Sequence, residues 1–246
     1  MSEAERPIRI TPDMLLGRRV DFERRMRRVP PVTVALVVAL GAVFGVEVVA
    51  GALDSRDAII AAGALLREAV VAGEWWRLVS ATFLHGSGDH LLSNVIALFI
   101  LGMVCEHGFG RGQYLILYAA SGVGGSLLSL LTTPGPSVGA SGAIFGLQGA
   151  AIVLFRRHRD RLLVRDRRIG FVLLVWAAYS IFGGILDPYV DNGAHLGGAV
   201  TGALVARGLH PVVLEPLTDE QAFRVRCWLW VASALLGGTL VGMLTR

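Results

Sequence analysis

The chain has 246 residues, of which 54% are hydrophobic and 17% are charged, and its formal net charge is +4. Soluble domains carry about a quarter charged residues, so this composition argues against a soluble globular protein. The positive charge does not indicate nucleic-acid binding, because the arginines cluster at 1–30 and 156–168, beside apolar runs, and a basic segment alone is weak support for such binding.

Seven apolar runs follow one another along the chain, and we expect them to form membrane helices, which need about 20 mostly apolar residues for a full span. They cover residues 31–53, 90–105, 114–131, 141–155, 170–186, 194–206 and 227–244. The segment 54–89 is mixed in polarity, so its apolar stretch 58–66 is expected at the membrane interface. The predicted fold is therefore all-α, a polytopic helical membrane bundle.

The two arginine-rich segments predict the orientation of this bundle, because short basic segments beside apolar spans stay in the cytoplasm. If segment 1–30 is cytoplasmic, the fourth span returns segment 156–168 to the same side, so both segments agree. The connections 54–89, 132–140 and 187–193 then lie outside. The second, fourth and sixth spans consequently begin at one depth, near the outer leaflet.

Polar side chains stand at these three helix starts. His90 and Asn94 open the second span, Ser141 opens the fourth, and His195 opens the sixth. Polar groups at membrane depth are costly and usually face a bundle interior or a water-filled cavity. A serine hydroxyl needs a base that takes its proton, and histidine, with an unperturbed pKa of about 6.5, suits that role. We therefore predict Ser141 as nucleophile and His195 as its base.

The tetrahedral intermediate of such a reaction needs hydrogen-bond donors for its oxyanion. The candidates are His90, Asn94 and the backbone N–H of Ser141, which lies at a helix N-terminus. Gly139 and Gly142 on either side of the serine allow a substrate backbone to approach. A further pair of glycines, Gly198 and Gly202, has the spacing that packs membrane helices closely, and it would hold the sixth span against the fourth.

Several short motifs occur in order between residues 73 and 202. They are Gly73-Glu74-Trp75-Trp76-Arg77, the segment from His85 to Asn94, Gly102 to Glu106 with Gly110, Gly139-Ala140-Ser141-Gly142, and Ala194-His195-Leu196-Gly197-Gly198 with Gly202. With these motifs at this spacing, the chain resembles the rhomboid intramembrane proteases. That resemblance covers the central half of the chain.

The resemblance implies a Ser141–His195 dyad without a third acidic partner, and an oxyanion hole on His90 and Asn94. It also implies that the ring of Phe145 packs on His195, and that the Trp76-Arg77 pair belongs to an outer loop dipping into the membrane edge. Substrates would be single-pass or multi-pass membrane proteins, cut in their transmembrane segments near small residues. The second and fifth spans would form a lateral gate.

Three parts are expected along the chain. Residues 1–30 form a basic cytoplasmic segment, flexible or lying on the surface. Residues 31–209 form a six-helix catalytic core, and residues 210–246 add a linker and a seventh transmembrane helix. The expected location is the plasma (inner) membrane of a bacterium, with a cytoplasmic N-terminus and an active site that opens to the outer side. The lipid bilayer is therefore a partner, and nucleic acid is not.

Other interpretations are weaker. A metal site at His85, Asp89 and His90 lacks the His-Glu-x-x-His pattern, so neither a metal nor another cofactor is predicted. A transporter would carry charged residues in several spans, and only Glu47, whose role we cannot assign, lies inside one. The main alternative is a catalytically silent relative that binds membrane segments.

Two smaller expectations concern single residues. Glu106 is expected to order the short turn that follows the second span. Cys105 and Cys227 are expected to be small buried hydrophobes, because they offer neither a disulfide framework nor a metal-ligand spacing.

Overall fold

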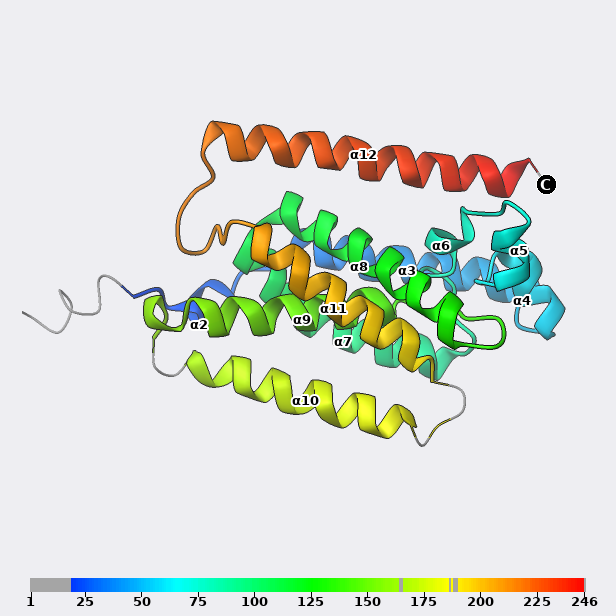
Figure 1. Ribbon diagram of the computed structural model, residues 1–246, viewed down its shortest axis with the longest axis horizontal. Coiled ribbons are helices and arrows are strands. Elements are labelled where there is room, and N and C mark those ends of the chain that lie inside the picture. Colours follow the sequence, from blue (N-terminus) through cyan, green and yellow to red (C-terminus); the bar gives the residue numbers. More distant parts are fainter. Residues whose placement is uncertain (1–18, 164–165, 186, 188–189, 246) are drawn as a thin grey trace, which may run out of the picture.

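The computed structural model describes residues 19–163, 166–185, 187 and 190–245. In this part of the chain every regular element is a helix, and Figure 1 shows the long helices lying side by side in one bundle, roughly along the horizontal axis of the view. The long helices are α3 (Pro31–Val49), α7 (Gly88–Phe109), α8 (Arg111–Thr132), α9 (Ser141–Arg157), α10 (Arg167–Ile185), α11 (Asn192–Gly208) and α12 (Asp219–Leu244). Helices α3, α7, α8, α10 and α12 are long and apolar enough to cross a membrane. The predicted all-α membrane bundle, with six core helices and a seventh at the C-terminal end, is confirmed.

Helices α9 and α11 form the centre of the bundle. Their backbones touch, because a Cβ added at Gly198 would lie 1.9 Å from the carbonyl oxygen of Gly142, and one at Gly202 would lie 2.0 Å from that of Gly146. The predicted role of the two glycines in packing these helices is thus confirmed. By contrast, α10 exposes large apolar side chains such as Phe171 and Phe182, as expected of a helix that faces lipid.

Glu106 joins α7 to the start of α3. One carboxylate oxygen accepts the N–H of Val32 at 3.1 Å, and the other accepts the N–H and the hydroxyl of Thr33, both at 2.8 Å. The first N–H groups of a helix have no partner inside it, so this buried carboxylate caps α3 from a neighbouring helix. Glu106 therefore anchors α3, and our expectation that it orders the turn after α7 was wrong.

Replacing Glu106 by glutamine is expected to lower the free energy of unfolding by about 1–3 kcal/mol, because one amide oxygen cannot replace two acceptor oxygens and the new NH2 group would face backbone donors. Denaturation followed in detergent micelles measures this change. Glu68→Gln is the matched control, because Glu68 is exposed on an outer helix. Equal stability of the two variants would contradict the anchoring role.

The described end of the N-terminal segment packs against the bundle. Phe22, in the short helix α2 (Phe22–Arg25), is fully buried, and its ring meets that of Phe155 edge-on at 5.0 Å between centroids. Its N–H donates to the carboxylate of Asp166 at 2.9 Å, just before α10. Val20 pairs with Leu162 in an isolated bridge beside the short helix η1 (Arg159–Arg161). Residues 19–28 are thus built into the fold, while residues 1–18 of the predicted flexible segment lie outside the described residues.

The segment between α3 and α7 carries three short helices, α4 (Arg56–Ala62), α5 (Arg67–Val71) and α6 (Arg77–Ser80). The guanidinium of Arg77 is buried, forms an ion pair with Glu74, and donates to the carbonyl oxygens of Ile60 at 2.7 Å and Ala64 at 2.5 Å. It also lies over the ring of Trp76, 4.8 Å from its centroid. The Trp76-Arg77 pair therefore holds this loop together.

Helix α12 lies at the edge of the bundle, apart from the central pair (Figure 1). It packs on α8, where the side chain of Val225 lies over Gly112, and on the outer loop, where Trp76 lies over Gly242. Most of its other side chains are exposed, including Cys227, so the expectation of burial is wrong for Cys227 and confirmed for Cys105.

Candidate active site

The helices that carry the predicted site residues begin at one end of the bundle. Helices α7, α9 and α11 all start at the end where α4, α5 and α6 lie (Figure 1). Helices α9 and α11 have 17 residues each. At a rise of 1.5 Å per residue they are about 25 Å long, shorter than the hydrocarbon core of about 30 Å. Neither helix is therefore long enough to cross the hydrocarbon core on its own.

Gly139 brings the start of α9 to the start of α7. Its φ of +128° favours glycine, and a Cβ there would lie 2.7 Å from Cε1 of His90 and 3.6 Å from Nδ2 of Asn94. Its N–H donates to the carbonyl oxygen of Ala81 at 2.9 Å, which joins the loop to the residue after α6. Two residues further, Ser141 is the first residue of α9. His90 and Asn94, the predicted oxyanion donors, thus lie against Gly139, two residues before Ser141.

His195 lies beside the first turn of α9. The ring of Phe145, one turn beyond Ser141, stacks on the His195 ring with centroids 4.1 Å apart and planes at 17°. The carbonyl oxygen of Ala194 approaches Gly142, where a Cβ would meet it at 3.3 Å. Among the described residues, no hydrogen bond joins the Ser141 hydroxyl to the His195 ring, whose buried Nδ1 has no partner. Catalytic hydrogen bonds are often long without substrate and tighten when it binds.

The carboxylate of Asp191, which precedes α11, is surrounded by donors. It accepts the hydroxyls of Ser129 at 2.5 Å, Ser137 at 2.6 Å and Thr133 at 2.7 Å, and the N–H of Ala194 at 2.8 Å. Burial raises the pKa of Asp191, but these hydrogen bonds outweigh burial and hold it below its ordinary value. Asp191 was not among the predicted site residues, because its only local signal is an acidic side chain at the N-cap position of the sixth span.

Glu47, whose role we could not assign from the sequence, holds His85, the residue whose ring packs against His90. Its buried carboxylate accepts the N–H of His85 at 3.0 Å. The ring of His85 is fully buried and meets the His90 ring edge-on at 5.2 Å. Burial and the neighbouring His90 lower the pKa of His85 to about 4, so His85 is neutral at pH 7. His85 is thus a packing partner of His90.

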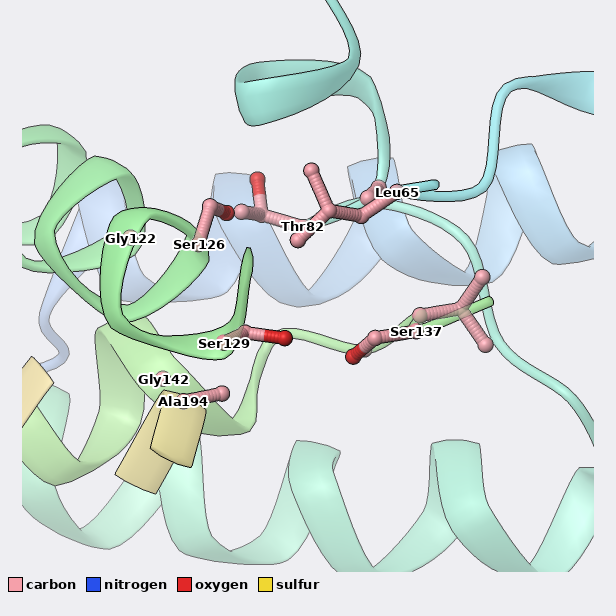
Figure 2. Close-up of a pocket in the computed structure, with 11 residues that line it drawn as sticks. Leu65, Thr82, Gly122, Ser126, Ser129, Ser137, Gly142 and Ala194 are labelled. Atoms are coloured by element: carbon pink, nitrogen blue, oxygen red, sulfur yellow. The ribbon is translucent and has the colours of Figure 1, made fainter. Parts of the chain in front are cut away.

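A small cavity of about 20 Å³, lined by both hydroxyl and apolar groups, adjoins Gly139 and Gly142. Figure 2 shows the Ser129 and Ser137 hydroxyls pointing toward one another across it, with Thr82 and Ser126 on the facing wall. A cavity needs about 10–15 Å³ to hold one water, so this one has room for a single molecule next to Gly142. Among the described residues, no three His, Cys, Asp or Glu side chains gather as metal ligands.

The predicted supporting residues fall into two groups. Gly139, Gly142 and Phe145 lie at the start of α9 and contact the predicted oxyanion donors or the α11 segment that carries His195. Trp76 and Arg77 support the outer loop, which reaches the site through Ala81.

The rhomboid-domain family model matches residues 72–212, more than half of the chain. The chain belongs to the rhomboid family. The predicted recognition is therefore confirmed, and the matched segment includes every site residue that the sequence predicted.

Several curated rhomboid proteins are similar in sequence to this chain. Rhomboid protease AarA of Providencia stuartii is 33% identical over 199 residues, which cover 71% of this chain and 70% of AarA. Rhomboid protease GluP of Bacillus subtilis is 35% identical over 159 residues, which cover 65% of this chain but only 31% of GluP. RHOMBOID-like protein 5 of Arabidopsis thaliana is 41% identical over 150 residues, 57% of this chain and 46% of that protein. The chain thus spans less than half of two of these rhomboid relatives.

Proposed function

We propose that this rhomboid protein is an intramembrane serine endopeptidase that cleaves transmembrane segments of other membrane proteins near the outer leaflet. The observation that carries the proposal is the convergence of Ser141, His195, His90 and Asn94 at one end of the bundle, with Phe145 stacked on His195. AarA and GluP are both named rhomboid proteases, which supports peptide-bond hydrolysis.

In the proposed mechanism, His195 takes the hydroxyl proton as Oγ of Ser141 attacks the carbonyl carbon of the scissile bond. The tetrahedral intermediate collapses, the C–N bond breaks, and the leaving amine takes the proton from His195. Water then attacks the resulting ester, His195 accepts a proton from that water, and the proton returns to Ser141 as the acid product leaves. The Phe145 ring would hold the imidazole in place during both proton transfers.

The oxyanion of each intermediate would be held by three donors. Nδ2 of Asn94 is buried and has no hydrogen-bond partner among the described residues, so it is available to an incoming oxyanion. The N–H of Ser141 lies in the first turn of α9, where helix N–H groups have no partner within the helix. The His90 ring, packed against Gly139, would be the third.

The membrane setting places demands on the substrate and on the protein. A helical peptide bond is shielded by its own hydrogen bonds, so the substrate must unwind before Ser141 can reach it. Water must enter as well, and the short α9 and α11 would leave an opening toward the outer side. We propose α7 and α10 as the lateral gate, the plasma (inner) membrane of a bacterium as location, and a cytoplasmic N-terminus.

The alternative function is that of a catalytically silent rhomboid protein that binds membrane segments and does not cut them. Such a protein has no need for a serine, a histidine stacked on an aromatic ring and an unengaged Asn94 amide at one end of the bundle. The presence of Ser141, His195, His90 and Asn94 together favours the protease.

The proposal is tested by reconstituting the purified protein in liposomes with a fluorescent reporter whose transmembrane segment contains small residues. The parent is expected to cut this segment near its outer end, as mapped by mass spectrometry, and Ser141→Ala is expected to leave it intact. Cleavage by Ser141→Ala at the parental rate would refute the assigned nucleophile. Binding of several such reporters by the parent without cleavage of any would favour the silent alternative.

A further inference from the structure

We infer that Asp191 is a positioning residue that holds His195 and Ser141 in register, an inference that rests on the proposed protease function. It does so by tying the first turn of α11 to α8 and to the loop that leads into α9. Asp191 stands four residues before His195 and would touch neither the substrate nor the reacting atoms.

The acceptor capacity of this carboxylate is fully used. Oδ2 accepts the hydroxyls of Ser129 and Ser137 at 2.5 and 2.6 Å, and Oδ1 accepts the hydroxyl of Thr133 and the N–H of Ala194 at 2.7 and 2.8 Å. An ionised carboxylate offers about four acceptor sites. Asp191 therefore has no acceptor site left for the His195 ring, so its role differs from that of a third triad member.

The donors come from the elements that surround the site. Ser129 lies in the last turn of α8, and Thr133 caps its C-terminal end. Ser137 lies in the loop before α9, where its N–H and carbonyl also pair with Leu65, both at 2.9 Å. Ala194 lies in the first turn of α11. A single anion thus joins the element that carries His195 to the loop that delivers Ser141.

The backbone of Asp191 reinforces this link. Its carbonyl oxygen accepts the N–H of His195 at 3.1 Å, while its side chain accepts the N–H of Ala194. Both hydrogen bonds fix the first turn of α11, and the side chain fixes that turn to the loop. Movement of the loop relative to α11 would change the distance from the Ser141 hydroxyl to the His195 ring.

The bundle itself does not depend on Asp191 for its packing. Further along the two helices, Gly198 and Gly202 of α11 meet the α9 backbone directly. Those contacts hold the helices together, whereas the Asp191 hydrogen bonds hold their ends. Loss of the carboxylate should therefore loosen the site more than it destabilises the fold, since catalytic groups must be held within about 0.5 Å of the productive geometry.

The test compares Asp191→Asn with the parent in the reconstituted reporter assay. A misplacement of about 1 Å can cost on the order of 100-fold in rate, so we expect kcat to fall by about 10- to 100-fold while KM stays within about twofold. The labelling rate of Ser141 by a fluorophosphonate probe should fall in parallel, because it depends on the dyad and not on substrate entry. Asp57→Asn, an exposed change on α4, is the matched control and should keep parental kinetics.

Removing single donors provides a second set of variants that retain the carboxylate. Ser129→Ala and Ser137→Ala should each lower kcat less than Asp191→Asn does, and combining either with Asp191→Asn should add little further loss, because the partners act as one network. All rates are expressed per active site, with active sites counted by labelling to completion. They are measured at a temperature well below the midpoint of thermal unfolding of each variant.

Five outcomes would overturn the inference. The inference fails if Asp191→Asn has the parental kcat, or if only its KM changes. It also fails if the losses of kcat in the double variants are additive, or if a smaller folded fraction of Asp191→Asn explains the whole loss of activity. A parent that neither cleaves nor takes the probe would overturn the proposed function together with this inference. A parent that cleaves beside an equally active Asp191→Asn variant would overturn the positioning role alone.

Discussion

Replacing His195 by alanine is expected to slow cleavage of a transmembrane reporter more than about 1,000-fold, to the level left by Ser141→Ala. Without the imidazole, the Ser141 hydroxyl has no base for its proton, and the leaving amine has no acid. Because the two residues act as one unit, the double variant should be no slower than either single variant. Initial rates of all four proteins in liposomes measure this.

His107→Ala is the matched control for this change. His107 lies at the C-terminal end of α7, where its Nδ1 is bonded to the carbonyl oxygen of Met103 at 2.8 Å, away from the starts of α9 and α11. Its loss should leave cleavage within about twofold of the parent, since a surface or edge change usually has little effect. Retention of more than a few per cent activity by His195→Ala, or a further loss in the double variant, would contradict the dyad.

Gly202→Ala is expected to destabilise the fold more than any other change discussed here, by about 3 kcal/mol or more, because overpacking against a fixed backbone cannot be relieved by a side-chain shift. The added methyl carbon would lie 2.0 Å from the carbonyl oxygen of Gly146, with two further backbone atoms at 2.5 Å. The two central helices must separate to admit it. Thermal unfolding in detergent should show a lower midpoint, and activity should fall with it.

Gly183→Ala is the control for helix propensity. Gly183 lies within α10, and a Cβ there would meet nothing within 4 Å. Alanine in a helix interior is favoured over glycine by about 1 kcal/mol, so this variant should be at least as stable as the parent. Equal stability of Gly202→Ala and Gly183→Ala would show that the α9–α11 contact is not tight.

The spans were predictable from hydropathy, but their ends were not. The second span was expected over 90–105, whereas α7 runs from Gly88 to Phe109. The extra turn holds Glu106 and His107, whose polarity hides the helix from a hydropathy argument. The outer loop was expected to contain one interfacial piece at 58–66, yet Gly63, with φ of +114°, ends α4 inside that stretch. The left-handed conformation of Gly63 ends the helix there, although the residues on both sides are apolar.

The site was predictable in part for a different reason. Topology alone places the starts of the second, fourth and sixth spans together, so His90, Ser141 and His195 follow from counting membrane crossings. Asp191 and Glu47 do not follow, because their roles lie in hydrogen bonds to Ser129, 62 positions away, and to His85, 38 positions away. Periodicity and local motifs carry no information about partners at such separations.

The contacts of Phe22 determine when this part of the fold can form during synthesis. Its acceptor, Asp166, lies 144 positions later in the chain. At about 5–20 residues per second, Phe22 is synthesised roughly 7–29 s before Asp166, and helices α3, α7, α8 and α9 are synthesised in that interval. Phe155, against which the Phe22 ring packs, is made only shortly before Asp166. The packing of Phe22 against the bundle is therefore a late event in folding, although it uses some of the earliest residues made.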